Sequence, residues 1–583
     1  MLIPTLLRWC GRPLAQQFEA AAKAPALAQQ SLLQKSLTRH QTSAFGIAHG
    51  FSQIYTAADY RQAVPIQDYE ALRPYVQRMM QGEANVLVSD PVQMFTLTSG
   101  TTGQPKYIPV TAFSAARNAR LMRQWLYRLQ VDHPRCFRGA MVGIVSPAVE
   151  GHTANGIPYG SLTGRIYREL PWLMRRAYAI PYPVFEIEDY DARYWAITRY
   201  ALARQASFLC TPNPSTLLRL AGVMADRADS LIRAIHDGTL AGAEQGLTPE
   251  QKEQLRPRPQ PQRARELEQI ANATGTLQPK DCWPDLQVIG CWTGGSVGVQ
   301  AQRLVSAYGT VPIRDAGYLA SEARVTLPIE DGTPSGVLDL TLNYYEFIPE
   351  GAVDEADPPV YLSHELEVGQ RYSILLTTPG GLYRYHINDI VEVTGFYHQA
   401  PLLAFVRKGK DMSSLTGEKL HANQILAAMD RVQQQLGIEL AAFQWVADVE
   451  RMGYRLYLEW PEEQAAWQED SWIQQTLLPA LDRSLANLNG EYAQKRDSGR
   501  LRPLCGYRMR PGWAEAVKRE AIVTNSRDVQ YKWPVLCPEL QSDSVTASYQ
   551  QAVLPQASTP SQHLPFSHDH KLTYLRKYAN IKP

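Results

Sequence analysis

The sequence has little of what marks secreted, membrane or nucleic-acid-binding proteins. Its seven cysteines are scattered through 583 residues and form no CxxC pair, which argues against a disulfide framework and against a zinc knuckle. No segment approaches the roughly 18 consecutive apolar residues that span a bilayer. Pro4, Arg8 and Arg12 interrupt the stretch in which a signal peptide needs an apolar core. We therefore expect a cytoplasmic protein without a membrane segment.

Neither sign of charge is in excess, because 58 Lys and Arg stand against 57 Asp and Glu, for a formal net charge of +1. A nucleic-acid binder held by phosphate neutralisation needs clustered Lys and Arg, and the sequence has no dominant basic block. We therefore expect neither nucleic acid nor a membrane surface as a partner. At about 150 residues per domain, the length allows two to four domains.

Short apolar runs alternate with helix-like stretches through the first half of the chain. Residues 12–45 predict mostly helix, and residues 74–80 predict a short helix with Pro74 in its first turn. Continuous apolar strands between helices are typical of βα units, whose sheet is covered on both faces. The sequence therefore predicts an α/β fold. The apolar runs are Met94–Leu97, Gly139–Val145, Ser207–Cys210, Leu286–Cys291 and Val311–Ile313.

The pattern changes after Tyr372, where closely spaced apolar runs predict a β-rich subdomain, and the polar segment Arg407–Ser414 predicts a hinge. A helix at 422–436 and a strand at 454–460 predict a smaller α+β domain beyond the hinge. Ser, Gln, Thr and Pro are frequent after residue 540, which predicts poor order. We therefore expect a large N-terminal domain over 1–408, a smaller mobile domain over 409–540 and a tail over 541–583.

The clearest chemical signal is the segment Thr98-Ser-Gly-Thr-Thr-Gly-Gln-Pro-Lys106, which lies between two strand-like runs. Glycines let backbone N–H groups turn toward an anion, hydroxyls add donors, and a lysine supplies a point charge. The segment therefore predicts a phosphate-binding loop, although it lacks the GxxxxGK[ST] pattern of a P-loop. The alternative is a polar turn with a solvated Lys106.

Two carboxylates suggest further nucleotide contacts. Glu322 ends the segment Gly317-Tyr-Leu-Ala-Ser-Glu322, and a carboxylate beside a triphosphate commonly holds Mg²⁺. Asp389 follows Tyr383-Arg-Tyr-His-Ile-Asn388 at the start of an apolar run, where it is a candidate to accept hydrogen bonds from two ribose hydroxyls. The alternatives are an exposed loop glutamate and an aspartate that caps a turn.

Arg117, Arg120 and Arg123 recur every third residue in the helix-like stretch after the loop. They are candidates to face a carboxylate of a substrate. The alternative is a solvated basic face of the helix.

These segments resemble a known family. Thr98–Lys106 is similar to the phosphate-loop signature of the adenylate-forming superfamily of acyl and aryl ligases. The other motifs resemble the Gretchen Hagen 3 family of acyl-acid amido synthetases, the auxin-responsive enzymes of plants with bacterial relatives, and the chain is identified as a bacterial-type member. They follow the family order between about residues 90 and 540: Gly156–Gly160, Asn213–Leu218, Cys291–Ser296, Tyr345–Pro349, Leu382–Tyr385 with Asp389, Val393–Phe396, Glu418–Lys419 and Gln530–Lys532.

The resemblance implies that ATP and Mg²⁺ bind, with Glu322 serving the metal and the phosphates and Asp389 holding the ribose. It implies catalytic roles for Lys106, for Lys419 just beyond the hinge and for Lys532 on the mobile domain. It also implies that Gly294, Gly295 and Ser296 line the adenine pocket near Tyr318. The remaining residues implied to bind the nucleotide are Thr98, Ser99, Gly100, Thr101, Thr102, Gly103, Ser321 and Arg407.

Three positions depart from the family pattern. The family loop is often written without the Gln-Pro-Lys ending, so Lys106 follows the wider superfamily. His386 and Asn388 stand where the family commonly has a basic residue and a glycine before the ribose aspartate. These two residues are therefore expected to change the local geometry around Asp389.

The resemblance implies an ATP-dependent acyl-acid amido synthetase that acts as a monomer. Such an enzyme converts a small carboxylic acid to an acyl-adenylate and pyrophosphate, and then transfers the acyl group to an amine, here expected to be an amino acid. Positioned hydroxyls, backbone N–H groups, a lysine and Mg²⁺ suit the charge that builds on the phosphoryl group. Two alternatives remain, a coenzyme A ligase that uses the same adenylate and a non-catalytic nucleotide-binding homologue.

Overall fold

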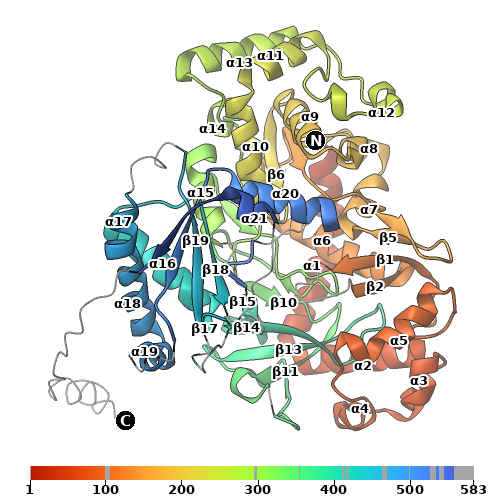
Figure 1. The fold of residues 1–583 in the computed structure, drawn as a ribbon. Helices are drawn as coiled ribbons and strands as arrows, with labels where there is room; N and C mark the ends of the chain where they lie inside the picture. The colour runs from red at the N-terminus through yellow and green to blue at the C-terminus, as the bar shows by residue number, and fades with distance from the viewer. Residues whose placement is uncertain are drawn as a thin grey trace. The chain divides into compact units, whose positions relative to one another are not determined.

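A computed structural model describes residues 2–98, 106–294, 298–353, 355–409, 412–413, 415, 418, 420–448, 450–462, 469–497, 499, 501–525, 533–537 and 544–556. The chain divides into two compact units, drawn in Figure 1. Unit 1 comprises Met1–Ser413, Leu420–Leu426 and Gly512–Pro538. Unit 2 comprises Ser414–Lys419, Ala427–Pro511 and Glu539–Pro583. The first crossing between the units lies just beyond the boundary that the sequence predicts at residue 408.

A four-stranded parallel sheet in the order β3-β6-β7-β8 lies in unit 1. Its strands are short and apolar, and every described residue of β3 and β7 is buried, as a sheet covered on both faces requires. This sheet and its helices confirm the predicted α/β fold. The strands are β3 (Ala140–Gly143), β6 (Ala206–Cys210), β7 (Val288–Cys291) and β8 (Ile313–Asp315).

Helices between these strands bury their apolar faces in one hydrophobic cluster with the sheet. Helices α11, α12 and α13 gather at the top of Figure 1. The Pro- and Arg-rich stretch after Gln254 connects α12 to α13. The helices are α7 (Leu162–Arg168), α8 (Trp172–Arg175), α9 (Tyr190–Leu202), α10 (Pro214–Asp226), α11 (Ala228–Asp237), α12 (Pro249–Gln254), α13 (Pro261–Thr274), α14 (Pro279–Cys282) and α15 (Gly298–Tyr308).

The β-rich part of unit 1 is a seven-stranded antiparallel sheet in the order β12-β11-β13-β14-β15-β10-β9. It confirms the β-rich subdomain that the sequence predicts after Tyr372. The strands are β9 (Thr326–Leu327), β10 (Gly336–Leu338), β11 (Tyr344–Pro349), β12 (Tyr361–Leu362), β13 (Arg371–Thr377), β14 (Tyr385–Tyr397) and β15 (Ala400–Lys408).

A smaller sheet carries the predicted phosphate loop. Its order is β2-β1-β5-β4, with β1 antiparallel to β2 and parallel to β5. Strands β1 and β2 confirm the two strands predicted on either side of the loop, and residues 99–105 between them lie outside the described residues. The strands are β1 (Val92–Thr98), β2 (Lys106–Thr111), β4 (Gly151–His152) and β5 (Pro158–Gly160).

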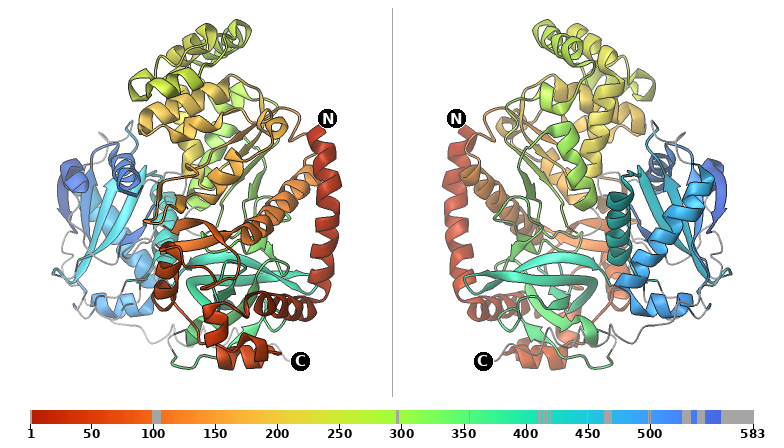
Figure 2. Two further views of the ribbon diagram at one scale, coloured as in Figure 1. Left: turned by 90° about the vertical axis from the view of Figure 1, so that its right-hand side faces the viewer. Right: turned by 90° about the vertical axis from the view of Figure 1, so that its left-hand side faces the viewer.

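The chain opens with helices, as the sequence predicts, and α1 packs against α6 (Figure 2). The predicted start of the helix at 74–80 is wrong. Helix α5 begins at Tyr69 because the Asp68 carboxylate accepts a hydrogen bond from the Ala71 N–H at 3.0 Å and caps the helix. Pro74 therefore lies inside the helix. The helices are α1 (Leu2–Lys23), α2 (Pro25–His40), α3 (Ala44–Ala48), α4 (Ala57–Ala63), α5 (Tyr69–Met80) and α6 (Ala112–Asp132).

Unit 2 is an α+β structure built on β18, β19, β20 and β22, in that order. Helix α16 matches the predicted helix at 422–436 and β19 matches the predicted strand. Two elements, α21 and β22, lie within the predicted tail, and the rest of that tail lies outside the described residues. Helix α16 (Ala422–Leu436) begins in unit 1 and continues into unit 2 from Ala427. The other elements are β18 (Ala442–Asp448), β19 (Gly453–Glu459), α18 (Leu478–Leu488), α19 (Gly490–Asp497), β20 (Cys505–Met509), α21 (Ser544–Tyr549) and β22 (Gln550–Pro555).

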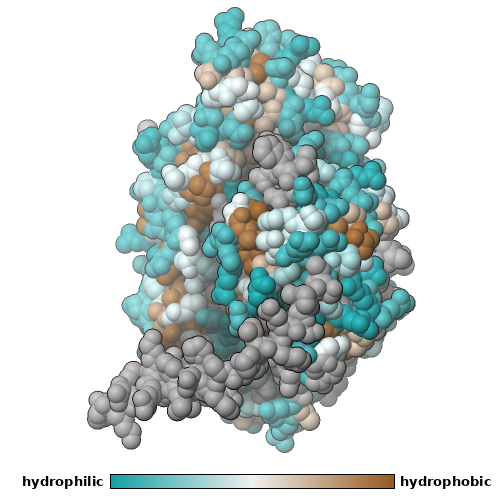
Figure 3. All heavy atoms as spheres, turned by 60° about the vertical axis from the view of Figure 1, so that its left-hand side comes forward, coloured by the Kyte–Doolittle hydropathy of each residue, from teal (hydrophilic) through white to brown (hydrophobic). Residues whose placement is uncertain are grey.

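Among the residues that the structure describes, no helix combines the length and the apolar character needed to cross a membrane. On the face drawn in Figure 3, hydrophobic residues occur in separate small patches among hydrophilic ones. Scattered exposed apolar side chains of this kind are ordinary on folded proteins.

Candidate functional site

The ends of the predicted phosphate loop are held against the segment that carries Glu322. Thr98, the last residue of β1, pairs with Lys106, the first of β2. The Ser321 hydroxyl donates to the Leu97 carbonyl at 3.1 Å, and the Thr96 hydroxyl donates to the Ser321 carbonyl at 3.2 Å. Two segments that lie far apart in sequence therefore meet at the base of the loop. Ser99, Gly100, Thr101, Thr102 and Gly103 lie outside the described residues.

Lys106 and Glu322 meet through a tyrosine. The Lys106 ammonium Nζ donates to the Tyr385 hydroxyl, and that hydroxyl donates to Glu322 Oε1, each across 3.5 Å. Burial, with Glu322 and Asp389 nearby, raises the pKa of Tyr385, so its phenol stays protonated. Lys106, Tyr385 and Glu322 are thus connected by two successive hydrogen bonds at the end of the predicted phosphate loop. Sequence reasoning placed Tyr385 in a family motif and gave it no role.

The predicted ribose residue is buried and paired with the predicted adenine residue. The Tyr318 hydroxyl donates to Asp389 Oδ2 at 2.6 Å, and Asp389 is 2% exposed. Burial and the nearby Asp389 carboxylate raise the pKa of Tyr318 well above its usual range. The Phe405 ring lies 5.7 Å from the Tyr318 ring, measured between centroids. One face of the site is therefore aromatic and ends in a carboxylate.

The two departures near Asp389 have a structural basis. Asn388 adopts φ +61°, in the left-handed region where asparagine is one of the few tolerated alternatives to glycine. Its carbonyl accepts a hydrogen bond from the Gly409 N–H at 2.8 Å. His386 Nε2 lies 2.7 Å from the Ser373 hydroxyl on the neighbouring strand β13. Asn388 can therefore place Asp389 as a glycine would, and His386 belongs to the sheet.

A residue that sequence reasoning missed lies at the end of β8. The Asp315 carboxylate accepts three hydrogen bonds, from the Thr293 N–H, the Thr293 hydroxyl and the Gly317 N–H, at 2.6, 2.7 and 2.6 Å. Its position at the carboxyl end of a parallel strand was a usable signal, because ligands of open α/β sheets bind at that edge. Asp315 thus connects Thr293 to Gly317, and these two residues directly precede Gly294 and Tyr318.

Several predicted residues are placed only in part. Arg407 lies on β15 opposite Ile390, one position from Asp389, and its side chain lies outside the described part of the structure. Glu418, which precedes Lys419, is buried in unit 2, where its backbone carbonyl accepts from the Asn489 amide at 2.8 Å and its carboxylate accepts from the Tyr454 hydroxyl. Four further predicted residues lie outside the described residues: Gly295, Ser296, Lys419 and Lys532.

The carboxylate of Glu322 fits a nucleotide-bound metal better than a resident one. Within the described residues, no group of three or more His, Cys, Asp or Glu side chains is arranged to hold a metal ion. Mg²⁺ that accompanies a nucleotide usually takes one or two carboxylates, and phosphates and waters fill its other positions. The single carboxylate beside Lys106 and the phosphate loop agrees with that donor set.

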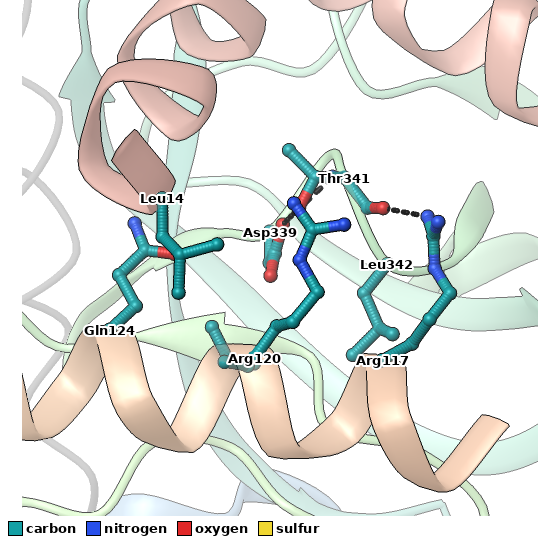
Figure 4. Close-up of a pocket in the computed structure, with 8 residues that line it drawn as sticks. Leu14, Arg117, Arg120, Gln124, Asp339, Thr341 and Leu342 are labelled. Carbon is teal, nitrogen blue, oxygen red and sulfur yellow. Dashed lines mark hydrogen bonds between the residues drawn. The ribbon is translucent and has the colours of Figure 1, made fainter. Parts of the chain in front are cut away.

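Arg117 and Arg120 of α6 line a different pocket, which Figure 4 shows between α1, α6 and the turn after β10. Arg117 donates to the Thr341 carbonyl and Arg120 to the Gln17 side chain. Arg123 donates to the Ala119 carbonyl of its own helix at 3.2 Å. Asp339 lies in the same pocket, bonded to Thr341. These contacts favour a structural role for Arg117 and Arg120 over a role toward an acyl carboxylate.

The chain is similar to known proteins over most of its length. The chain is 26% identical over 410 residues to an indole-3-acetic acid-amido synthetase, GH3.10, of Arabidopsis thaliana, covering 65% of this chain and 68% of that protein. It is 24% identical over 501 residues to a 4-substituted benzoates-glutamate ligase, GH3.12, of the same plant, covering 82% and 86%. A solved GH3.15 acyl acid amido synthetase has the same fold, with a TM-score of 0.80 at 19% identity over 94% of this chain and 97% of that one.

Three family models match consecutive parts of the chain. The GH3 family N-terminal domain matches residues 14–313, the central domain matches 336–408 and the C-terminal domain matches 423–541. Together they span most of the sequence and both units of the structure. The chain therefore belongs to the GH3 family.

Proposed function

We propose that this protein is an ATP-dependent acyl-acid amido synthetase, a ligase that forms a C–N bond through an acyl-adenylate. The observation that carries the proposal is the meeting of Lys106, Tyr385 and Glu322 with Tyr318 and Asp389 in unit 1. Membership of the GH3 family supports it, as does the similarity to an indole-3-acetic acid-amido synthetase and to a 4-substituted benzoates-glutamate ligase.

In the first half-reaction, the substrate carboxylate attacks the α-phosphorus of ATP and pyrophosphate leaves. Lys106 is proposed to neutralise phosphate charge, and its hydrogen bond to the Tyr385 hydroxyl, which in turn donates to Glu322, supports this role. Preorganised donors of this kind contribute about 3 kcal/mol each to transition-state stabilisation. Glu322 is the residue for Mg²⁺, which offsets charge on the phosphates when bound. Asp389 and Tyr318 are proposed to hold the ribose and the adenine, and Ser321, Gly294, Gly295, Ser296 and Arg407 are proposed as further nucleotide contacts.

In the second half-reaction, the amine of an amino acid attacks the adenylate carbonyl, the amide bond forms and AMP leaves with the electron pair of the broken C–O bond. Lys419 and Lys532 are proposed as the catalytic residues of the mobile domain, which act when the site changes between the two half-reactions. The mobile domain is proposed to span 409–540 and to turn at Arg407–Ser414. The substrates are a small carboxylic acid and an amino acid, and the working form is proposed to be a cytoplasmic monomer that binds neither nucleic acid nor membranes.

The test is ATP–pyrophosphate exchange with Mg²⁺ over a panel of aryl, indole and fatty acids. The expected result is exchange that depends on one acid, and an amide product when amino acids are added. A thioester formed with coenzyme A in a parallel reaction would replace the proposal with the coenzyme A ligase. ATP binding without exchange on any acid would favour a non-catalytic homologue.

A variant of Lys106 tests the proposed site directly. Lys106→Met removes the charge and keeps the length of the side chain, and is expected to lower the exchange rate at least about a hundredfold, the loss typical of one transition-state donor. Lys252→Met is the matched control, because Lys252 lies on the α12 helix and is exposed. Equal exchange rates in the two variants would remove Lys106 from the catalytic site.

A further inference from the structure

One buried carboxylate joins the two turns that carry the predicted adenine residues. Asp315 Oδ2 accepts from the Thr293 N–H at 2.6 Å and from the Thr293 hydroxyl at 2.7 Å, while Oδ1 accepts from the Gly317 N–H at 2.6 Å. Thr293 precedes Gly294 in the turn after β7, and Gly317 precedes Tyr318 in the turn after β8. Each oxygen of the carboxylate therefore serves one turn.

The turn after β8 couples Asp315 to Tyr318 and Asp389. Gly317 adopts φ +87°, and a Cβ at that position would lie 2.5 Å from the Thr326 carbonyl oxygen. The Tyr318 N–H donates to the Thr326 hydroxyl at 2.8 Å, and the Tyr318 hydroxyl donates to Asp389 at 2.6 Å. A shift of the Gly317 N–H would therefore move Tyr318 and, through it, the contact with the ribose residue Asp389.

The strand that carries Asp315 is held by contacts other than its carboxylate. The Trp125 indole Nε1 donates to the Asp315 backbone carbonyl at 2.9 Å. Strand β8 pairs with β7 at Ile289, Gly290 and Cys291. Removing the charge of the Asp315 side chain would consequently leave β8 paired and would release the two turns.

Burial makes this carboxylate costly to keep. Asp315 is 4% exposed, and burial raises its pKa to about 6 although the three hydrogen bonds oppose that rise. Because folding disfavours the charged form of this carboxyl group, its ionisation lowers the free energy of unfolding at neutral pH. Its bonds to two turns on the ligand edge of the sheet suggest a role in ligand binding instead.

We propose that Asp315 is a positioning residue for the nucleotide, whose carboxylate holds the Thr293–Gly294 turn and the Gly317–Tyr318 turn at the spacing that admits the adenine ring. The inference rests on the proposed function, because it takes these turns to line the adenine pocket. It assigns Asp315 no contact with ATP and no step in the chemistry.

The test is Asp315→Asn in the full chain, with ATP affinity measured by calorimetry in the absence of the acid. The amide keeps one acceptor oxygen and turns an NH₂ group toward the N–H donors of the other turn. The dissociation constant for ATP and the KM for ATP are expected to rise about tenfold, the effect of one lost charge-assisted hydrogen bond. The KM for the acid is expected to stay unchanged. The value of kcat is expected to fall by a smaller factor than the affinity for ATP.

Two further variants separate positioning from general destabilisation. Asp331→Asn is the matched control, because Asp331 accepts from Arg314 Nε of the same strand at 2.6 Å and contacts neither turn. It is expected to lower the melting temperature and to leave ATP affinity unchanged. Thr293→Val removes only the hydroxyl donor and is expected to weaken ATP binding less than Asp315→Asn, while Thr293→Ser restores the wild-type affinity.

Unchanged ATP affinity in Asp315→Asn would overturn the inference, and so would an equal loss of affinity in Asp331→Asn at the same melting temperature. If Asp315→Asn does not fold, the Thr293→Val and Thr293→Ser pair decides in its place. A wild-type protein that binds ATP but catalyses no exchange contradicts the proposed function alone, since the affinity comparison still tests Asp315. A wild-type protein that binds no ATP contradicts both.

Discussion

Asn388 has a backbone conformation that most side chains disfavour. At φ +61° a Cβ approaches the following carbonyl, which costs most L-residues about 1 kcal/mol or more, while glycine is free of that cost. We expect Asn388→Ala to lower the free energy of unfolding by about 1 kcal/mol, and Asn388→Gly to change it by only a few tenths. Urea unfolding of the three proteins measures this. Equal midpoints for the alanine and glycine variants would contradict the conformational explanation.

Asp315 predicts how stability changes with pH. Because burial raises its pKa from 3.8 to about 6, the folded state favours the protonated form. The stability that this group contributes is fully present below pH 3.8 and is lost as the pH rises through about 6. Asp315→Asn is neutral throughout. We therefore expect the wild-type protein to lose stability relative to this variant between pH 4.5 and pH 7, as measured by paired urea titrations, in which a constant difference would exclude the shift.

Glu346 is a buried carboxylate between two arginines, and it ties α4 to the central strands. It accepts from Arg61 Nε and from Arg384 Nε, each at 2.9 Å, and the side chains of Glu346 and Arg384 are 1% and 5% exposed. Glu346→Gln leaves the buried Arg384 cation without its partner, which typically costs about 3 kcal/mol of unfolding free energy. Chemical denaturation measures that loss.

The control for Glu346 is the exposed pair Glu70 and Arg73 on α5, whose charges are already solvated. Glu70→Gln is expected to leave the unfolding midpoint unchanged within error. If both substitutions cost the same, the burial of Glu346 does not determine its contribution.

At the scale of elements, glycines inside two helices predict opposite effects of the same substitution. A Cβ on Gly11 of α1 would lie 2.4 Å from the Tyr127 ring of α6, whereas a Cβ on Gly222 of α10 meets nothing within 4 Å. Gly11→Ala is therefore expected to separate α1 from α6 and to cost about 1–3 kcal/mol. Gly222→Ala is expected to stabilise α10 by about 0.5–1 kcal/mol, because alanine is the better helix former.

Melting temperatures of the two alanine variants and the wild type measure this difference. The expected order is Gly222→Ala highest, wild type next and Gly11→Ala lowest. If Gly11→Ala melted above the wild type, helix propensity would outweigh the close approach of α1 to α6.

Local sequence patterns predict an element and its ends where the apolar periodicity and the flanking residues agree. The amphipathic run at 422–436 predicts α16 with both ends, because its periodicity and its flanking residues agree. The predicted start of α5 is wrong because a proline in a helix is most common in its first turn, and Pro74 lies further inside. The capping hydrogen bond of Asp68 decides where that helix begins.

At the scale of the whole molecule, the chain passes between its two units several times. Unit 1 contains α20 (Trp513–Asn525), although the family C-terminal domain matches 423–541. Glu515 of α20 accepts from the Tyr190 hydroxyl at 2.8 Å, and Arg519 donates to Asp191 at 2.8 Å. A late segment of the sequence is therefore part of the unit that holds Asp389 and Tyr318.

The proposed nucleotide site predicts selective stabilisation of unit 1. A ligand that binds only the folded state adds about 2.7 kcal/mol at a concentration 100 times its dissociation constant. We expect ATP with Mg²⁺ to raise the first thermal transition that includes unit 1, and GTP at the same concentration to raise it less. Differential scanning calorimetry measures both. Equal shifts for the two nucleotides would contradict an adenine pocket formed around Tyr318.

The sequence by itself indicated several of the helices and strands and the position of the predicted phosphate loop between two strands, because apolar periodicity, glycines and hydroxyls act over a few neighbouring residues. It also marked Lys106, Glu322 and Asp389 as candidates. Only the tertiary structure decided that Tyr385 stands between Lys106 and Glu322, and that Asp315 bonds to two turns at once. A buried polar group is satisfied by donors brought to it by strand order and register, and local sequence does not specify those.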